Sequence, residues 1–409
     1  MRGALARRVV ERGVGRFPVR LRYPDGHEVG GGAPGSSTVE LVRPRELYRR
    51  LGEHPKIGLG EAYMAGDWRV ADGSDLAVFL RPFAERVTAI VPSWMLRLRA
   101  LVDRAIPHHQ RNTPEGSRRN IEAHYDLSNE LFIRFLDDTL SYSSAIFHPE
   151  RALLEQTLEE AQARKIETAL DAAGVGEGTR LLEIGTGWGS LAIAAAERGA
   201  QVTTITLSGE QRALALERIE AAGLSDLIDV RLEDYREVEG KYDAVVSIEM
   251  IEAVGEEFWA TYFETIDARL RPGGRAVVQA ILMDHDRYLA TRNSFGWIQK
   301  YIFPGGMIPT IPAIEQATGA TTTLSLTATN AFGRSYAETL RRWRERFLAN
   351  WPAIAEHGFD GRFRRMWEFY LAYCEAGFAA GYLEVAQLTF VKAPAVSSSG
   401  RERSLVHQR

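Results

Sequence analysis

The sequence predicts an α/β fold in which a parallel, doubly wound sheet forms the larger of two domains. From about residue 150, apolar strand-like runs alternate with helix-like segments at the spacing of βαβ units. The first of these strands runs into a glycine turn and an alanine-rich helix, LLEIGTGWGSLAIAAAERGA (181–200). Residues 17–90 have short strand-like runs and Gly-rich turns instead, which predicts a smaller N-terminal domain. In such a sheet, ligands bind at the carboxyl ends of the strands.

The expected elements follow this division. In the smaller domain, strands are expected at VRLRY (19–23) and STVELV (37–42), and IGLGEAYMAGDWRV (57–70) is expected to form a compact, turn-rich unit. A polar break, HHQRNTPEGSRRN (108–120), predicts the linker. The larger domain is expected to contain a helix over 153–174, a strand over 180–185, a helix over 190–199, a strand over 201–208, a helix over 209–223, strands over 226–234 and 242–250, a helix over 256–274, a strand over 274–283, and helices over 337–351 and 361–383 that cover the sheet.

Composition narrows the class of protein. The 409 residues suffice for two domains, and a hydrophobic content of 45% with a net charge of −4 is ordinary for a globular protein. The single cysteine, Cys374, excludes an internal disulfide, and the absence of Cys and His clusters predicts no metal site. No run of 18 apolar residues and no signal-peptide pattern occurs, so a cytoplasmic protein is expected.

Two stretches of the chain are basic. Residues 1–24 hold seven arginines and one acid, a local charge of +6, and residues 92–112 interleave arginines with large apolar side chains. This pattern suits an anionic membrane surface. Each stretch alone is also explained by a solvated helix face or a frayed terminus. No nucleic-acid-binding module accompanies the charge, so no nucleic-acid partner is expected.

The glycine turn indicates which cofactor binds. Its glycines, Gly185, Gly187 and Gly189, form GxGxG, whereas a dinucleotide fingerprint has its third glycine one place later, where Ser190 stands. Glu183 precedes the turn, and acid-x-Gly-x-Gly-x-Gly after the first strand is typical of S-adenosylmethionine (SAM) sites in class I methyltransferases. Polar groups that face the adenine are expected at the end of the third strand, Glu233, Asp234 and Tyr235. Plain turn glycines are the alternative interpretation.

Beyond this turn, the chain resembles the cyclopropane fatty acid synthases. The similar segments run in order from about residue 45 to 392 and include IGLGEAYMAGDW, HYDLSNELF, LSYSSAIF, LEIGTGWG, TLSGEQ, EDYREV, SIEMIEAVG, WIQKYIFPGG and YLAYCEAGF. The resemblance implies SAM-dependent methylation of the cis double bond of an unsaturated acyl chain, held in a phospholipid. It also implies a lipid-binding domain with linker over 1–115, a methyltransferase domain with a helical lid and acyl-pocket helices over 116–393, and a disordered tail over 394–409.

The resemblance also implies site residues. The full set expected to contact the cofactor is Tyr142, Ser143, Glu183, Gly185, Thr186, Gly187, Trp188, Gly189, Thr206, Leu207, Ser208, Gln211, Glu233, Asp234, Tyr235 and Glu249. The set expected at the reacting centre is Glu252, Tyr336, Gln279, Ser144 and Ile281. In cyclopropane-forming relatives, a glutamate, a histidine, a tyrosine and backbone near a cysteine hold a bicarbonate that serves as the base. Simpler roles remain open: Ser208 as a helix cap, Glu252 as a helix-start acid and Tyr336 as a core tyrosine.

Two departures from the family pattern bear on the product. Ser144 replaces the cysteine of YSCA, and Gln279 replaces the histidine, leaving only a neutral hydrogen-bond donor. A weaker or displaced base lets the carbocation undergo a 1,2-hydride shift, and proton loss from the methyl group then gives an exocyclic methylene. The sequence resembles most the actinobacterial enzymes of 10-methyl (tuberculostearic-type) fatty acid synthesis, which predicts a methylene product; ring closure is the alternative.

Several expectations about partners follow from the resemblance. They are a homodimer, a peripheral position at the inner face of an anionic membrane, and a flavin- or NADPH-dependent reductase that completes the methyl branch. Bicarbonate is a second cofactor that the altered site could still bind. Two rival functions are a catalytically silent lipid carrier and a small-molecule N- or O-methyltransferase, which would have no need of the first 115 residues.

Overall fold

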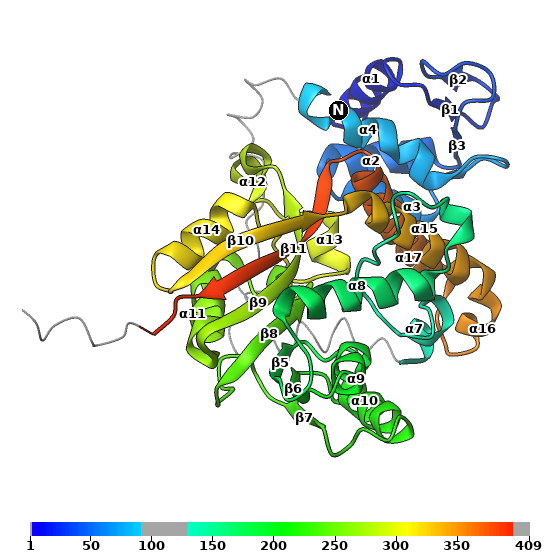
Figure 1. Ribbon diagram of the computed structural model, residues 1–409. Helices are drawn as coiled ribbons and strands as arrows, with labels where there is room; N and C mark the ends of the chain where they lie inside the picture. The colour runs from blue at the N-terminus through cyan, green and yellow to red at the C-terminus, as the bar shows by residue number, and fades with distance from the viewer. Residues whose placement is uncertain (1, 91–128, 396–409) are drawn as a thin grey trace, which may run out of the picture.

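The computed structural model describes residues 2–90 and 129–395 (Figure 1). Four predictions concern residues outside these ranges: the basic, apolar stretch at 92–112, the linker at 108–120, the domain boundary near residue 115 and, from residue 396 onward, the tail. In the described residues, no helix is both long and apolar enough to span a bilayer.

A seven-stranded sheet forms the centre of the molecule, in the order β10-β11-β9-β8-β5-β6-β7 (Figure 1). Its strands are β5 (Arg180–Ile184), β6 (Gln201–Thr206), β7 (Ile228–Leu232), β8 (Tyr242–Ile248), β9 (Leu270–Met283), β10 (Leu324–Ala331) and β11 (Leu383–Lys392). The strands from β5 to β9 pair in parallel, and β11 runs antiparallel to both of its neighbours. The predicted Rossmann-like, doubly wound sheet is therefore confirmed, and β10 and β11 extend it beyond the predicted strands.

Helices cover both faces of this sheet. One face packs against α8 (Leu158–Ala173), α9 (Ser190–Glu197) and α10 (Gly209–Ala221), and the other against α11 (Trp259–Arg269) and α14 (Ile311–Gly319). Successive side chains of a strand point to opposite faces, so Leu181 packs with the first set of helices and Leu182 with the second. Such burial on both faces explains why these strands read as continuous apolar runs.

The helix expected over 153–174 begins later than predicted. Leu153–Glu155 forms a single 3₁₀ turn, and α8 starts after Thr157. Thr157 and Glu160 form a reciprocal capping box that satisfies two of the free N–H groups at the helix start. Gly174 ends the helix in the left-handed conformation, with φ of 72°.

The N-terminal unit has its own four-stranded sheet, in the order β2-β1-β3-β4. Its elements are α1 (Arg2–Val14), β1 (Arg20–Arg22), β2 (Glu28–Val29), β3 (Thr38–Leu41), α2 (Pro44–Glu53), α3 (Gly58–Ala65), β4 (Trp68–Val70) and α4 (Leu76–Ile90). The turn-rich unit expected at 57–70 is wrong, because this stretch forms α3 and β4. Gly60 faces a neighbour instead of a turn: a Cβ there would lie 2.5 Å from Nε1 of Trp297.

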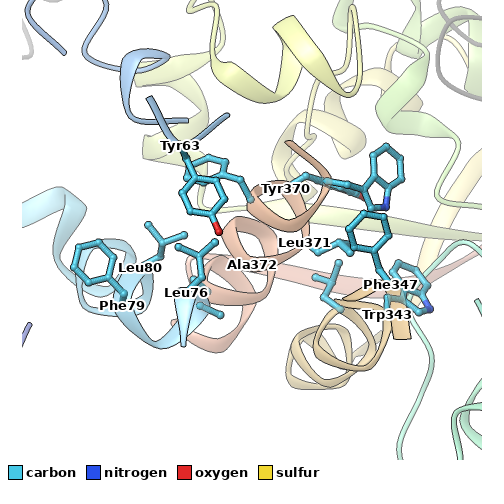
Figure 2. Packing of buried hydrophobic residues seen from close by; sticks show 14 of the residues in the cluster. Tyr63, Leu76, Phe79, Leu80, Trp343, Phe347, Tyr370, Leu371 and Ala372 are labelled. Carbon is cyan, nitrogen blue, oxygen red and sulfur yellow. The ribbon is translucent and has the colours of Figure 1, made fainter. Parts of the chain in front are cut away.

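Long helices join the N-terminal unit to the sheet. The remaining elements are α7 (Asn129–Phe135), short 3₁₀ turns at Ile251–Ala253 and Glu256–Phe258, α12 (His285–Thr291), α13 (Trp297–Tyr301), α15 (Gly333–Ala349), α16 (Trp351–Ala355) and α17 (Gly361–Ala379). In Figure 2, Tyr63, Leu76, Phe79 and Leu80 of the N-terminal unit lie beside Tyr370, Leu371 and Ala372 of α17, with Trp343 and Phe347 of α15 on the other side.

An ion-pair network crosses the same junction. Arg344 of α15 is buried and donates to Glu375 of α17 and to Asp75 of the N-terminal unit, both at 2.9 Å. A buried arginine is tolerated when its charge is paired in this way. One hydrophobic core runs from the N-terminal unit into residues 297–303, α15 and α17, which together we call the lid.

Candidate active site

The glycine turn follows β5 and opens a cavity at the carboxyl edge of the sheet. Gly185, Gly187 and Gly189 have φ of 101°, 52° and 89°, a left-handed region that favours glycine. Backbone N–H groups of Gly185 and Thr186 donate to the carbonyl oxygen of Ile205 in β6, which fixes the turn on the sheet. A turn built in this way exposes its backbone to a ligand at the switch point between β5 and β8.

Most of the predicted cofactor contacts line this cavity. They are Tyr142, Ser143, Glu183, Gly185, Thr186, Gly187, Trp188, Thr206, Leu207, Gln211, Glu233, Tyr235 and Glu249. The structure does not place Gly189, Ser208 or Asp234 in the lining. Ser208 caps α10 by accepting from the N–H of Gln211, as the simpler interpretation had it. Asp234 pairs with Arg236 at 2.6 Å, and a Cβ on Gly189 would meet Ala215 of α10 at 3.4 Å.

Two buried ionisable groups border the cofactor cavity. The carboxyl group of Glu183 accepts from the hydroxyl of Thr204 at 2.6 Å, and burial raises its pKa to about 8. Lys165 was not predicted; its ammonium donates to the hydroxyl of Ser143 at 2.9 Å, and burial lowers its pKa to about 8. The sequence does carry a signal for Lys165, because it lies on the apolar face of α8 next to Ile166.

The shape and polar groups of the cavity suit SAM. The glycine turn leaves room for a ligand, since a Cβ on Gly187 would meet no protein atom within 4 Å. The hydroxyl of Tyr235 is buried without a hydrogen-bond partner and lines the cavity, and the Glu233 side chain adds a second polar group. When bound, SAM supplies an electrophilic methyl group. The turn, Tyr235 and Glu233 are the groups that would hold it.

A second, larger cavity of about 670 Å³ adjoins the first. This volume is within the usual range for ligand pockets, about 300–1,000 Å³. Most of its lining is apolar and comes from both parts of the chain, including Val14, Leu21, Leu41, Leu47, Phe79 and Leu80 of the N-terminal unit and Trp297, Phe303, Leu340, Tyr370 and Phe378 of the lid. Tyr142, Glu249 and Ala253 line both cavities, so the two meet at these residues.

A network of partly buried hydrogen bonds surrounds Glu249 at this meeting point. One oxygen of Glu249, Oε1, accepts from the backbone N–H of Ser144 and from the amide of Gln279, each at 2.8 Å. The other oxygen, Oε2, accepts from the hydroxyl of Tyr336 at 2.8 Å. Burial raises the pKa of Glu249, and the three donors oppose this rise. The amide of Gln279 is oriented in turn by Gln387, whose Nε2 donates to its oxygen at 3.1 Å.

Glu252 lies three residues further on and faces the larger cavity. Its Oε1 accepts from the backbone N–H of Ile281 at 2.5 Å, and its Oε2 is buried with no hydrogen-bond partner. Burial first, and then the nearby charge of Glu249, raise the pKa of Glu252 to about 8. The other four residues predicted at the reacting centre, Ser144, Gln279, Ile281 and Tyr336, therefore each donate to Glu249 or Glu252. The place of Glu249 in this network was missed, because it was predicted as a cofactor contact only.

No metal centre accompanies this network: among residues 2–90 and 129–395, no group of His, Cys, Asp and Glu side chains could hold a metal ion. Cys374 lines the larger cavity, and burial raises the pKa of its thiol to about 12, which keeps it uncharged.

Fold and site together define a class I SAM-dependent methyltransferase. The chain belongs to the mycolic acid cyclopropane synthetase family, whose match covers residues 112–388. It is 47% identical to the tuberculostearic acid methyltransferase UfaA1 of Mycobacterium tuberculosis over 95% of this chain and 91% of that protein. It is 33% identical to the cyclopropane-fatty-acyl-phospholipid synthase of Escherichia coli K12 over 87% of this chain and 88% of that protein.

Solved structures agree with this assignment. The cyclopropane synthase MmaA2 of M. tuberculosis superposes with a TM-score of 0.61 at 30% identity, over 70% of this chain and 99% of that one. The mycolic acid cyclopropane synthase CmaA1, complexed with SAH and CTAB, gives a TM-score of 0.61 at 29% identity, again over 70% and 99%. The predicted family, fold class and SAM-dependent methyltransferase activity are confirmed.

Replacing Gly187 by alanine should weaken SAM binding about tenfold, which corresponds to about 1.4 kcal/mol. The added methyl group would project into the cavity, and the left-handed backbone adds strain. Isothermal titration calorimetry with SAM measures the change. Gly178→Ala is the matched control, because Gly178 is exposed, has φ of 73° and lies outside the cavity. Equal SAM affinity in the two variants would contradict this role of the turn.

Stability should fall with rising pH in a way that depends on Glu252. Because the folded state raises the pKa of this carboxyl group from 4.5 to about 8, folding favours its protonated form. The stability it contributes is therefore complete below about pH 4.5 and is lost as the pH rises through about 8. Glu252→Gln imitates the protonated acid and should flatten the loss of unfolding free energy between these limits, measured by urea denaturation. The exposed neighbour variant, Glu257→Gln, should keep the wild-type slope; a wild-type slope in Glu252→Gln would contradict the assignment.

Proposed function

We propose that this enzyme transfers a methyl group from SAM to the cis double bond of an unsaturated fatty acyl chain of a phospholipid, and that it forms a 10-methylene chain. The observation that carries this proposal is the meeting of the cofactor cavity with a large apolar cavity at the carboxylate of Glu249. A small-molecule methyltransferase has no use for an apolar cavity that extends into the N-terminal unit. A catalytically silent lipid carrier would require neither the glycine turn nor the pair of glutamates.

The chemistry explains the shape of the site. An alkene is a weak nucleophile, so it must be held in line with the methyl group and away from water. The apolar lining excludes water, and Tyr142 at the junction has its hydroxyl 2.8 Å from that of Tyr370, which fixes both rings. Aromatic faces stabilise a carbocation on the acyl chain by cation–π attraction. The carboxylate of Glu249 lies at the same point and opposes the positive charge.

Two observations favour a methylene product over a ring. UfaA1, the relative at 47% identity, is named as a tuberculostearic acid methyltransferase, whereas the E. coli cyclopropane synthase is 33% identical. Gln279 also stands where a histidine is expected in ring-forming relatives, and it donates a neutral hydrogen bond to Glu249. The second candidate is a cyclopropane ring closed on the same substrate, which the family membership supports.

Incubation with SAM and oleoyl phospholipid should give a fatty acid heavier by one CH₂ group, detected by mass spectrometry. The methylene and ring products have equal mass, so proton NMR must distinguish them, with exocyclic vinyl protons expected for the first. Exclusive cyclopropane signals would support the second candidate. Unchanged fatty acids, with SAM binding intact, would contradict the proposed function.

We also propose that the N-terminal unit is the lipid-binding part and holds the enzyme at an anionic membrane face, on the cytoplasmic side. Val10 and Val14 on the inner side of α1 line the acyl cavity. On the outer side, Leu5 and Val9 are 65% and 62% exposed, beside exposed arginines at positions 8 and 12. Arginines near apolar side chains suit an anionic lipid surface. A homodimer and a partner reductase, flavin- or NADPH-dependent, complete the proposal on the ground of the family resemblance.

The double variant Arg8→Glu, Arg12→Glu should bind anionic vesicles at least about tenfold more weakly than the wild type, since each arginine contributes about 1 kcal/mol near such a surface. Cosedimentation with phosphatidylglycerol vesicles measures binding, and phosphatidylcholine vesicles give the neutral reference. Arg334→Glu with Arg362→Glu, which changes exposed arginines of α15 and α17, is the charge-matched control. Equal binding by both double variants would contradict membrane contact through α1.

A further inference from the structure

The groups expected to bind bicarbonate already bind an anion of the chain itself, the carboxylate of Glu249. The N–H of Ser144, the amide of Gln279 and the hydroxyl of Tyr336 all donate to the carboxylate of Glu249. Ser144 and Gln279 are fully buried, and Tyr336 is 6% exposed. A separate anion would lose these donors and would lie against a second negative charge in a buried site, which is costly. Bicarbonate therefore does not fit this arrangement.

The strained backbone conformation of Glu249 indicates that its side chain has a functional role. Within the described ranges, Leu140 and Glu249 are the non-glycine residues with positive φ, and Glu249 has φ of 50°. Glycine adopts this conformation freely, whereas a residue with a Cβ is strained. Strain of this kind persists where the surrounding structure imposes it and clusters at functional sites. At Glu249, the three hydrogen bonds to the carboxylate and a fourth, from its backbone N–H to the carbonyl oxygen of Gln279 at 2.8 Å, hold the strained residue in place.

Of the two buried glutamates, Glu249 is the one placed to act on the reacting atoms. It lines both the cofactor cavity and the acyl cavity, whereas Glu252 lines the acyl cavity alone. Three donors stabilise the ionised form of Glu249, and a single backbone N–H contacts Glu252. The negative charge therefore resides on Glu249. Its Oε2 accepts one hydrogen bond, from Tyr336, so this oxygen retains a lone pair for a proton.

We propose that Glu249 is the general base of the reaction and replaces bicarbonate, so that the enzyme needs no added anion. This inference rests on the proposed function. The π electron pair of the alkene forms the new C–C bond to the methyl carbon as the C–S bond breaks, and its electron pair stays on sulfur. After a 1,2-hydride shift, a C–H bond of the new methyl group breaks. Its electron pair forms the methylene double bond, and the proton passes to Oε2 of Glu249.

Activity measurements on the wild type and two variants test this assignment. The wild type should turn over at an unchanged rate in buffer freed of bicarbonate. Glu249→Gln keeps the shape of the side chain without its basicity and should lower kcat about 10²–10⁴-fold, the usual contribution of general base catalysis, with little change in KM for SAM. Glu257→Gln, an exposed glutamate of the same segment, should behave as wild type. A wild type that requires bicarbonate, or a Glu249→Gln variant with wild-type kcat, would overturn the proposal.

Glu249→Gly provides a test by rescue. Glycine accepts the positive φ without strain, so the fold should be retained, while the three donors lose their carboxylate. Added bicarbonate or formate should then raise the kcat of this variant at least about tenfold. The same anions should have no effect on Glu249→Gln. Circular dichroism and SAM titration check that both variants are folded. Failure of every small anion to rescue a folded Glu249→Gly variant would overturn the proposal.

A binding measurement separates this inference from the proposed function. Titration with ¹³C-labelled bicarbonate, followed by NMR, should show binding to Glu249→Gly and none to the wild type at the same concentration. This result does not depend on turnover. If the wild type methylates no acyl chain, the proposed function is wrong, and the titration still decides whether Glu249 takes the place of the anion. Bicarbonate binding of equal strength to both proteins would overturn the inference.

Discussion

The active site depends on one buried carboxylate and the three donors that hold it. Glu249 follows β8, Gln279 lies in β9, Tyr336 lies in α15, and Ser144 belongs to the segment that precedes α8. Hydrogen bonds to a charged group are about twice as strong as neutral ones, and they strengthen further where water is excluded. The same interaction therefore fixes the lid on the sheet and sets the charge at the junction of the two cavities.

Around this point, the fold supplies two environments of opposite character. The carboxyl edge of the parallel strands presents backbone and polar groups to the cofactor, as doubly wound sheets do. The lid helices and the N-terminal unit enclose an apolar space. The ion pairs of Arg344 tie the two parts together. The lipid side of the site is therefore a product of packing between domains, while the cofactor side is formed by the strand ends of the sheet together with α8 and the segment that precedes it.

The sequence predicted those features that local patterns determine. Strands β5 to β9 and their helices follow from apolar periodicity and from the glycine turn, because each is encoded within a short window. Strand β10 was missed because its side chains are largely exposed and polar, and β11 because it pairs with strands far away in the chain. The role of Glu249 was missed for the same reason: its donors lie 105, 30 and 87 residues away. The stretch around Gly60 was wrongly predicted to be turn-rich. Its glycine is needed for close packing against the ring of Trp297, and the sequence alone does not distinguish such a glycine from one in a turn.

A base that is part of the chain also fixes the electrical balance of the buried site. A sulfonium cation opposite the Glu249 carboxylate sums to zero, and so does a carbocation opposite the same carboxylate. Once the proton has moved, a thioether, an alkene and a carboxylic acid remain, and all three are uncharged. The reacting groups and Glu249 therefore carry no net charge at any stage of the cycle, which avoids the solvation cost of an unpaired charge beside the acyl chain, while the ammonium of Lys165 stays unchanged at the cofactor cavity. The cycle closes only when the enzyme returns that proton to water, which makes deprotonation of the Glu249 acid formed in the reaction a step in its own right.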